Sequence, residues 1–241
     1  MPKEKYEAIY RDLREKIEDE TYAYGEFLPS ENQLTEEYSC SRNTVRRALA
    51  RLTQEGCIQP QHGRGVRVIY SPVTPAEFII GGIESFAETA ERNHLQTETH
   101  VDALTDLTCD ERLSRRTGFP VGSELIYVRR VRFLDGVAAI LDTNVFLREV
   151  TGPLTTSVAA SSIYRYLEQD LGIKITTSRR RITSERATQA DMRYLDLDDF
   201  DFVSVVTGQT FDQKGRMFEY TQSRHRPDYF AFYDTAVRKH N

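Results

Sequence analysis

Apolar residues recur at helical spacing in three stretches of the first 56 residues. The first stretch covers about residues 6–20, and its apolar face is made by Tyr6, Ile9, Leu13 and Ile17. The second is short and starts after Ser30, which with Gln33 predicts a capping box. The third starts after Ser41, its predicted N-cap, and its apolar stripe is made by Val45, Ala48, Leu49 and Leu52. Gly56 follows, in the position where helices commonly end.

Two short apolar segments follow the third predicted helix, at residues 57–59 and 66–70. They flank a turn that contains Gly63 and Gly65, and this arrangement predicts a β-hairpin. Three helices and a hairpin within 70 residues predict a winged helix-turn-helix domain over residues 1–70. Residues 71–79 contain Pro72 and Pro75 and indicate a linker.

The pattern changes beyond residue 80. Strands are expected at residues 100–107, 125–133, 137–145, 173–187, 202–212, 216–225 and 230–237, and short helices at residues 85–94, 162–171 and 189–195. Asp135-Gly136 is a typical hairpin turn, and a second turn ends at Gly215. Hairpins interrupted by short helices predict an antiparallel α+β domain over residues 80–241. The expected fold class is therefore α+β, with a winged helix-turn-helix domain first.

Composition narrows the class of protein. Hydrophobic residues make up 39% of the chain and the mean hydropathy is −0.54. No apolar run approaches the roughly 20 residues of a membrane helix, and no secretory signal is evident, so a cytoplasmic location without membrane contact is expected. Cys40, Cys57 and Cys109 form no C-x-x-C pair, which favours buried thiols over disulfides or zinc. No metal or cofactor is expected.

Charge is distributed unevenly along the chain, whose formal net charge is −5. Residues 1–37 have a net charge of −6, whereas residues 38–70 carry six Arg and one Glu and have a net charge of +5. A basic segment in an otherwise acidic chain indicates a protein that contacts a polyanion with one face.

Four of these six arginines lie on the third predicted helix, which in a helix-turn-helix enters the DNA major groove. Arg can bond guanine, and Asn adenine, through two parallel hydrogen bonds, while hydroxyls at the helix start suit phosphates. The candidate contacts on this helix are Ser41, Arg42, Asn43, Thr44, Arg46 and Arg47. In the wing, Arg64 can reach a groove or phosphate, Gly63 permits close approach and His62 can donate to a phosphate. The alternative is a solvated basic helix face, but the surrounding elements favour DNA binding.

The segment "LPSENQLTEEYSCSRNTVRRALARLTQEGCIQPQHGRG" resembles the GntR family of bacterial transcription factors over nearly every position of the family pattern. That pattern is L-P-S-E, then S-R-x-T-V-R-x-A-L-x-x-L, then E-G and a G-x-G wing. The resemblance implies DNA-contacting or site-shaping roles for Glu31, Ser41, Arg42, Thr44, Arg46, His62 and Gly63.

Residues 83–233 resemble, at lower identity, the UTRA effector-binding domain of the HutC branch of this family. The resemblance rests on "IESFAE", "YVRRVRFLDGVAAILDTNVF", "SSIYRYLEQDLGI" and "MFEYTQSRHRPDYFAF". Such domains are similar in fold to chorismate lyase but bind ligands without catalysis. The resemblance implies a phosphate end lined by Ser85, Arg130, Arg132, Ser162 and Tyr164, and sugar contacts from Asp142, Glu219 and His225.

The residues themselves support an anionic ligand. Arg130 and Arg132 are two apart on a predicted strand, so both side chains leave the same face, which also carries apolar residues. An inward arginine is costly without an anionic partner, and phosphate is one such partner. A structural salt bridge with Asp142 or Glu219 is the alternative. Ser85 is placed to cap a helix beginning at Phe86, and a helix start favours phosphate, so Ser85 and Phe86 are both candidate effector contacts.

The sequence thus predicts a homodimeric repressor that binds operator DNA and is released by a sugar phosphate. "KYEAIYRDLREKIEDETY" resembles the N-terminus of trehalose-operon repressors, so trehalose 6-phosphate is the expected effector. N-acetylglucosamine 6-phosphate and glucosamine 6-phosphate are alternative effectors. Family members that bind amino-sugar phosphates, however, often have Glu at the position of Asp142, and Tyr is common at the position of His225. An enzyme is disfavoured because no catalytic constellation is evident. A purely architectural DNA-binding protein remains a further alternative.

Overall fold

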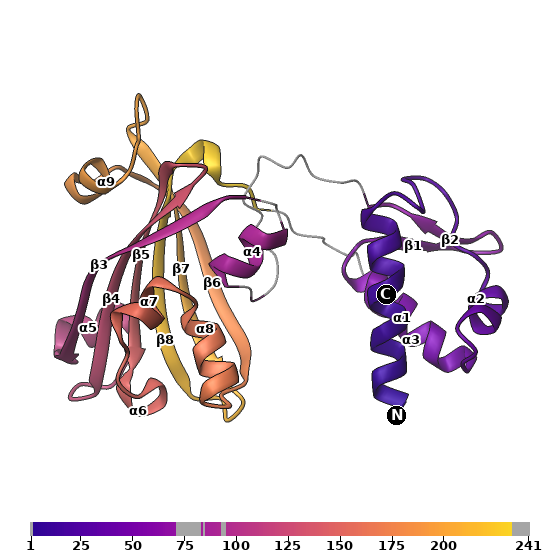
Figure 1. The fold of residues 1–241 in the computed structure, drawn as a ribbon, viewed down its shortest axis with the longest axis horizontal. Helices are drawn as coiled ribbons and strands as arrows, with labels where there is room; N and C mark the ends of the chain where they lie inside the picture. Colours follow the sequence, from indigo (N-terminus) through magenta and orange to yellow (C-terminus); the bar gives the residue numbers. More distant parts are fainter. Residues whose placement is uncertain (1, 71–82, 84, 93–94, 233–241) are drawn as a thin grey trace. The chain divides into compact units, whose positions relative to one another are not determined.

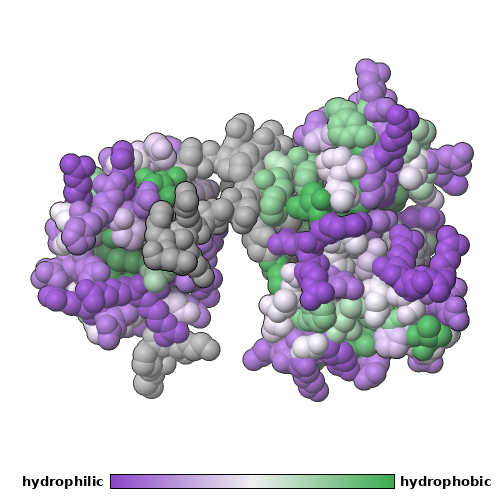
Figure 2. All heavy atoms as spheres, turned by 180° about the vertical axis from the view of Figure 1, so that it is seen from behind, coloured by the Kyte–Doolittle hydropathy of each residue, from purple (hydrophilic) through white to green (hydrophobic). Residues whose placement is uncertain are grey.

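The computed structural model describes residues 2–70, 83, 85–92 and 95–232, and these fall into two units (Figure 1). The N-terminal unit lies within residues 1–74 and the C-terminal unit within residues 75–233. On the face shown in Figure 2, hydrophilic residues cover most of the surface of both units, and hydrophobic residues form scattered patches. In the described part of the chain, no helix has the length and apolar character needed to cross a bilayer.

The N-terminal unit contains the predicted three helices and hairpin. Its elements are α1 (Pro2–Glu18), α2 (Glu31–Glu37), α3 (Arg42–Gln54), β1 (Ile58–Gln61) and β2 (Gly65–Val68). Both predicted N-caps are confirmed: the Ser30 hydroxyl accepts from the Gln33 amide in a full capping box, and the Ser41 hydroxyl accepts from the Thr44 amide. Gly56 has a φ of 72°, as expected directly after the C-cap of α3.

The predicted apolar stripe of α3 forms the centre of the N-terminal core. Val45, Ala48 and Leu52 are fully buried, and they pack with Leu13 of α1 and Leu34 of α2. Burying each such aliphatic side chain contributes roughly 1.5–3 kcal/mol, so this stripe fixes the rotation of α3 about its axis. The opposite side of α3 is therefore turned to solvent.

The C-terminal unit is built on one antiparallel sheet of six strands in the order β3-β4-β5-β8-β7-β6. The strands are β3 (Thr97–Thr108), β4 (Glu124–Leu134), β5 (Val137–Leu147), β6 (Ile175–Arg186), β7 (Phe202–Asp212) and β8 (Met217–His225). The helices are α4 (Phe86–Arg92), α5 (Glu111–Thr117), α6 (Arg148–Thr151), α7 (Thr156–Ala160), α8 (Ile163–Arg165) and α9 (Gln189–Tyr194). This confirms the α+β fold class.

Both faces of the sheet carry apolar clusters. On one face, Ile126, Val128 and Phe146 pack with Ile163 of α8 and Leu167 just after it. On the other face, Val131 and Leu141 pack with residues after α9, and Leu125 and Val145 pack near α5. Because successive side chains of a strand point to opposite faces, alternate residues of β4, β5 and β8 belong to the first face. We call it the pocket face.

Several elements differ from the sequence predictions. The predicted helix at residues 162–171 is a short α-helix followed by a π-helix, η1 (Tyr166–Asp170). The predicted strand at residues 230–237 is wrong where it can be assessed: a 3₁₀ helix, η2 (Pro227–Tyr229), precedes it, and of residues 230–232 only Ala231 forms an isolated bridge. Its residues 233–237 lie outside the described part. Helices α5, α6 and α7 were not predicted.

Candidate DNA-binding surface and effector pocket

The outward side of α3 carries Arg42, Asn43 and Arg46, all exposed. Arg46 Nε lies 2.9 Å from Glu31 Oε2, in an ion pair where both side chains remain largely solvent-accessible. Such a surface pair adds little to stability. It holds the Arg46 guanidinium near Glu31, the first residue of α2.

Arg47 and Arg51 lie on a different side of α3, against α1. The Arg47 guanidinium lies 4.0 Å from the centre of the Tyr6 ring, and that of Arg51 lies 3.8 Å from the centre of the Tyr10 ring. These cation–π contacts keep both arginines on the α1 side. Arg47 is exposed, like Arg42, Asn43 and Arg46 with which the sequence grouped it, but its contact with Tyr6 directs its side chain to the α1 side of the helix.

The start of α3 presents Ser41 and Thr44, whose hydroxyls lie 2.8 Å apart. The Ser41 hydroxyl already caps the helix by accepting from the Thr44 amide. Ser41 is nevertheless exposed, so its oxygen and the nearby amides remain open to an approaching phosphate group.

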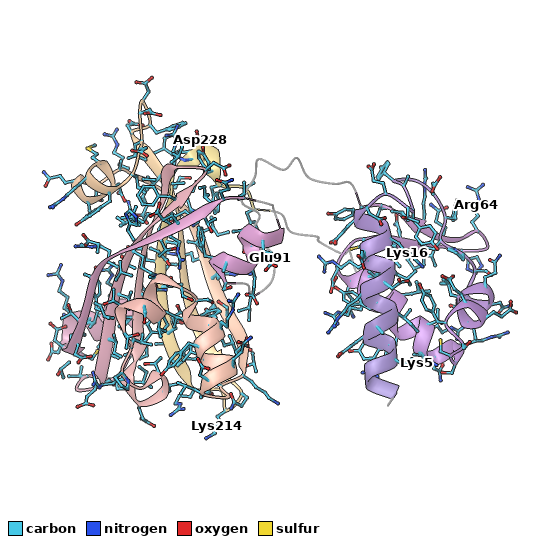
Figure 3. All side chains as sticks on the ribbon, viewed as in Figure 1. Lys5, Lys16, Arg64, Glu91, Lys214 and Asp228 are labelled. Atoms are coloured by element: carbon cyan, nitrogen blue, oxygen red, sulfur yellow. The ribbon has the colours of Figure 1, made fainter. Side chains whose placement is uncertain are left out.

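His62, Gly63 and Arg64 lie at the turn between β1 and β2, and all three are exposed. Figure 3 shows Arg64 at this turn. Gly63 has a φ of 72°, a left-handed conformation that other residues seldom adopt, and a Cβ there would meet nothing within 4 Å. Arg67 Nε donates to the Gly25 carbonyl at 2.8 Å and so ties the hairpin to the loop before α2.

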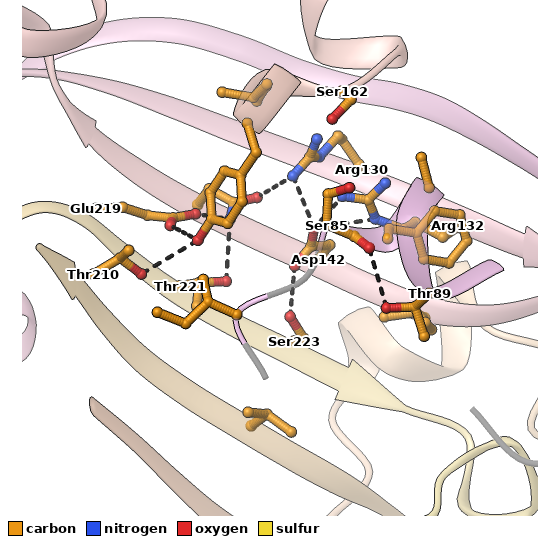
Figure 4. A pocket seen from close by; sticks show the side chains of 18 of the residues that line it. Ser85, Thr89, Arg130, Arg132, Asp142, Ser162, Thr210, Glu219, Thr221 and Ser223 are labelled. Carbon is orange, nitrogen blue, oxygen red and sulfur yellow. Dashed lines mark hydrogen bonds and ion pairs between the residues drawn. The ribbon is translucent and has the colours of Figure 1, made fainter. Parts of the chain in front are cut away.

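The pocket face of the C-terminal unit contains a hollow that is partly open to solvent. All nine predicted effector-binding residues line it: Ser85, Phe86, Arg130, Arg132, Asp142, Ser162, Tyr164, Glu219 and His225. Most come from alternate positions of β4, β5 and β8, as Figure 4 shows for the labelled strand residues. Polar lining residues that the sequence reasoning missed are Thr89, Asn144, Ser161, Ser178, Arg180, Thr210, Thr221 and Ser223.

Two buried arginines share one carboxylate in this pocket. Asp142 Oδ2 lies 2.9 Å from Arg130 Nη2 and 2.8 Å from Arg132 Nη2. The other carboxylate oxygen, Oδ1, accepts from the Ser223 hydroxyl at 2.6 Å. Arg130, Arg132 and Asp142 are 4%, 7% and 5% exposed, so this is a desolvated cluster of two cations and one anion.

The pKa directions reflect this charge balance. Burial, with repulsion from Arg132, lowers the pKa of Arg130 to about 10, which leaves the guanidinium charged at neutral pH. Burial alone would raise the pKa of Asp142, but the charges of Arg132 and Arg130 outweigh it and lower that pKa below its usual range. The cluster therefore keeps an excess of one positive charge. Among the described residues, Arg130 Nε has no hydrogen-bond partner.

A hydrogen-bond chain leads from these arginines across the sheet. Arg130 Nη2 donates to Asn144 Oδ1 at 2.7 Å, and Asn144 Nδ2 donates to Glu219 Oε1 at 2.8 Å. Tyr164 donates to Glu219 Oε2 at 2.5 Å and lies 3.3 Å from the Thr210 hydroxyl. Burial, and then the charge of Asp142, raise the pKa of Glu219 above its usual value. Tyr164 thus contacts the Glu219 side of the pocket and not the arginines.

The remaining predicted residues lie at the rim and ends of the pocket. Ser85 caps α4: its hydroxyl accepts from the Glu88 amide, and Glu88 Oε2 accepts from the Ser85 amide at 2.7 Å. The Arg132 guanidinium lies 4.4 Å from the centre of the Phe86 ring. Ser162 caps α8 by accepting from the Arg165 amide.

His225 is buried at the end of β8, with its ring centre 5.0 Å from that of Phe230. Burial lowers the pKa of His225 to about 4, since the charged imidazolium would lose its hydration. The ring is therefore neutral at pH 7. Among the described residues, no group of three or more His, Cys, Asp or Glu is placed to hold a metal ion.

Each of the two units matches a known protein family. Residues 5–68 match the family described as bacterial regulatory proteins, gntR family, and residues 92–231 match the UTRA domain. The HTH-type transcriptional regulator TreR of Bacillus subtilis is 35% identical over 99% of both chains. The effector-binding domain of the B. subtilis trehalose repressor TreR superposes with a TM-score of 0.54, at 33% identity over 59% of this chain and 99% of that one. The possible transcriptional regulator YydK of B. subtilis shares the fold, with a TM-score of 0.81 and 20% identity over 97% and 99% of the two chains.

Proposed function

This chain belongs to the gntR family of bacterial regulatory proteins and is a transcriptional regulator with a UTRA domain, and we propose that it represses a trehalose-utilisation operon until trehalose 6-phosphate binds. The families that it matches are those of regulators and not of enzymes. Operator DNA is its macromolecular partner, and a small molecule in the UTRA domain is its effector. The identity of that molecule, the dimeric state and repression are the proposed parts.

The arginine pair of β4 is the observation that carries the sugar-phosphate proposal. Arg130 and Arg132 are almost fully buried in a pocket, yet within the described part of the chain a single carboxylate, that of Asp142, is bonded to them. An uncompensated buried cation is expensive, and a phosphate that accepts from the free Nε of Arg130 and from Arg132 removes that cost. Asp142 then serves to hold both guanidinium groups in position.

The rest of the pocket suits a sugar. Asn144, Thr210, Thr221 and Ser223 offer both donors and acceptors, and the carboxylate of Glu219 can accept from sugar hydroxyls. Trehalose as the sugar is supported by the 35% identical relative, whose effector domain is that of a trehalose repressor. An amino-sugar phosphate is the alternative effector.

The contact between Arg132 and Phe86 suggests how binding is transmitted. Phe86 is the first residue of α4, so it lies at the end of the segment that connects the two units. A phosphate bonded to Arg132 competes for the guanidinium on which this contact depends. The effector changes operator affinity only as far as it prefers one arrangement of this segment over the other. Two such chains in a symmetric dimer would bind two operator half-sites.

Operator binding measured by fluorescence anisotropy tests this function. Trehalose 6-phosphate should weaken binding of the operator by about tenfold or more, within the usual range of allosteric coupling. Unphosphorylated trehalose and inorganic phosphate should do less. Operator affinity that is the same with and without every sugar phosphate would contradict the proposal.

A pair of variants makes the test specific. Arg132→Ala should bind the operator normally but no longer respond to the effector. Arg129→Ala is the matched control: it lies on the same strand but on the opposite face, where it pairs with Asp102 at the surface. A normally inducible Arg132→Ala protein would contradict the phosphate assignment.

A further inference from the structure

We propose that Asn144 is a positioning residue that keeps a cationic and an anionic part of the pocket apart, and that its neutral amide makes the pocket select a phosphorylated sugar over the free sugar. The cationic part contains Arg130, and the anionic part contains Glu219. This role of Asn144 rests on the sugar-phosphate function proposed above and adds a residue that the sequence reasoning missed.

The strand register places Asn144 between these two groups. On the pocket face of β5, Asn144 lies between Asp142 and Phe146, since successive side chains of a strand alternate between the two faces. Arg130 on β4 pairs with Asp142, and Glu219 on β8 pairs with Phe146. Both groups are therefore diagonal neighbours of Asn144, one on each adjacent strand, and long side chains at such positions can touch.

Both ends of the Asn144 amide are bonded to these groups. Its Oδ1 accepts from Arg130 Nη2 at 2.7 Å, while its Nδ2 donates to Glu219 Oε1 at 2.8 Å and to the Thr221 hydroxyl at 3.1 Å. Arginine has donors only, so the amide oxygen must face Arg130 and the amide nitrogen must face Glu219. Asn144 is 3% exposed, and both of its donors have a partner. The orientation of the amide is thus fixed.

The amide stands in place of a direct ion pair across the pocket. In the part of the chain that the structure describes, the carboxylate paired with Arg130 is that of Asp142, and Glu219 is linked to it through the amide. A direct pair with Glu219 would give the guanidinium a second carboxylate and weaken its attraction for a phosphate. The Glu219 carboxylate instead accepts from neutral side chains, including Asn144 and Tyr164. With about four lone-pair sites, it can accept from sugar hydroxyls as well.

The change Asn144→Asp would keep the shape of this side chain and reverse its effect. A carboxylate there would add a second negative charge directly against Arg130, so that two arginines and two carboxylates would balance. It would also set an acceptor oxygen against Glu219 Oε1, where the amide now donates. The neutral amide therefore preserves the excess positive charge of Arg130, Arg132 and Asp142 for a phosphate.

Calorimetric titration of the full-length protein with trehalose 6-phosphate and with trehalose tests this role. Asn144→Asp should reduce the ratio of the two affinities by about thirtyfold or more, as expected for a like charge roughly 8 Å from the phosphate at an effective dielectric constant of about 20. A residue that only supports the fold would weaken both ligands alike and leave this ratio unchanged.

Thr143→Asp is the matched control. It adds the same charge at the neighbouring position of β5, on the opposite face of the sheet, where Thr143 is half-buried and pairs with Arg129. A charge there lies outside the pocket and beside a surface arginine, so the ratio should change by less than about threefold.

A double variant keeps the test decisive if Asn144→Asp does not fold. Asn144→Asp combined with Glu219→Gln exchanges the amide and the carboxylate, so the net charge is that of the wild-type protein and an amide can again donate to a carboxylate between the two positions. The ratio should still fall by about tenfold or more, because the carboxylate is now in contact with Arg130.

The role of Asn144 is wrong if the ratio stays within about threefold of the wild-type value, as in the control, in the folded variants that carry Asn144→Asp. Failure of the wild-type protein to bind trehalose 6-phosphate would instead overturn the proposed function, so the two failures can be told apart.

Discussion

Arginines serve the two units in opposite ways. In the N-terminal unit, Arg42, Arg46 and Arg64 are exposed, and the one ion pair found for Arg46 among the described residues is a surface contact with Glu31. In the C-terminal unit, Arg130 and Arg132 are buried around Asp142. Exposed cations attract a polyanion at little cost to stability, whereas buried cations require a fitting anion. The difference agrees with operator DNA as the partner of the first unit and with the small anion that we propose as the effector of the second.

Removal of the Asp142 carboxylate, which Arg130 and Arg132 share, should cause the largest loss of stability. Asp142→Ala leaves two buried guanidinium groups without their anion, so the free energy of unfolding of the C-terminal unit should fall by about 3–5 kcal/mol. Urea denaturation of the wild-type and variant proteins measures this loss. The matched surface change is Glu111→Ala, which breaks the exposed pair with Arg115 and should cost less than about 1 kcal/mol. Equal losses in both variants would refute the contrast between buried and exposed pairs.

The burial of His225 should make the stability of the C-terminal unit depend on pH. Burial lowers the pKa of His225 to about 4, against about 6.5 in an unfolded chain, so the unfolded state binds a proton first as the pH falls. The stability that His225 contributes is therefore complete above pH 6.5 and is lost progressively between pH 6.5 and 4, by on the order of 3 kcal/mol. His225→Gln should flatten the pH dependence of unfolding in this window. An unchanged slope would show that His225 does not titrate as its burial indicates.

Within the DNA-binding surface, Arg46 should contribute more to operator affinity than Arg47, which faces α1. Arg46→Ala should weaken specific operator binding by about 1–3 kcal/mol, because its guanidinium is placed to reach a base edge. Arg47→Ala should weaken it less, since Arg47 lies against Tyr6. Anisotropy titrations with operator and with unrelated DNA measure both effects. A larger loss for Arg47→Ala would mean that its contact with α1 does not persist on DNA.

The smallest loss of DNA affinity is expected for Arg64, in the wing formed by β1, β2 and the turn between them. Arg64→Ala should weaken operator and unrelated DNA alike and reduce the salt dependence of binding by about one unit of slope, as expected for one lost phosphate contact. Titrations at several salt concentrations check this. A loss of specificity at one operator position would instead place Arg64 on a base edge.

The helix-turn-helix could be predicted almost completely from the sequence because its signals are local. Ser30 and Ser41 are caps with their partners only three residues away, and the stripe from Val45 to Leu52 has plain helical spacing. Even so, helical spacing alone grouped Arg47 with the outward arginines. Its contact with Tyr6 depends on how α1 packs on α3, which no local pattern specifies.

The effector pocket was predicted in part. Alternation along β4, β5 and β8 identifies the face that carries Arg130, Asp142 and Glu219. The contributions of Ser178 and Arg180 were missed because they depend on which strand pairs with β7, a contact between distant segments. The sequence also left open whether the two arginines bind an anionic ligand or form a salt bridge with a carboxylate side chain of the protein. The structure places Asp142 between them and still leaves Arg130 Nε without a partner among the described residues.

Calorimetric titration of the wild-type chain with trehalose 6-phosphate and with trehalose tests the central claim most directly, since the two ligands differ only in the phosphate. The account predicts saturable binding of trehalose 6-phosphate, far weaker binding of trehalose, and loss of that difference in Arg132→Ala. Equal affinity for the two ligands in the wild-type protein would contradict it.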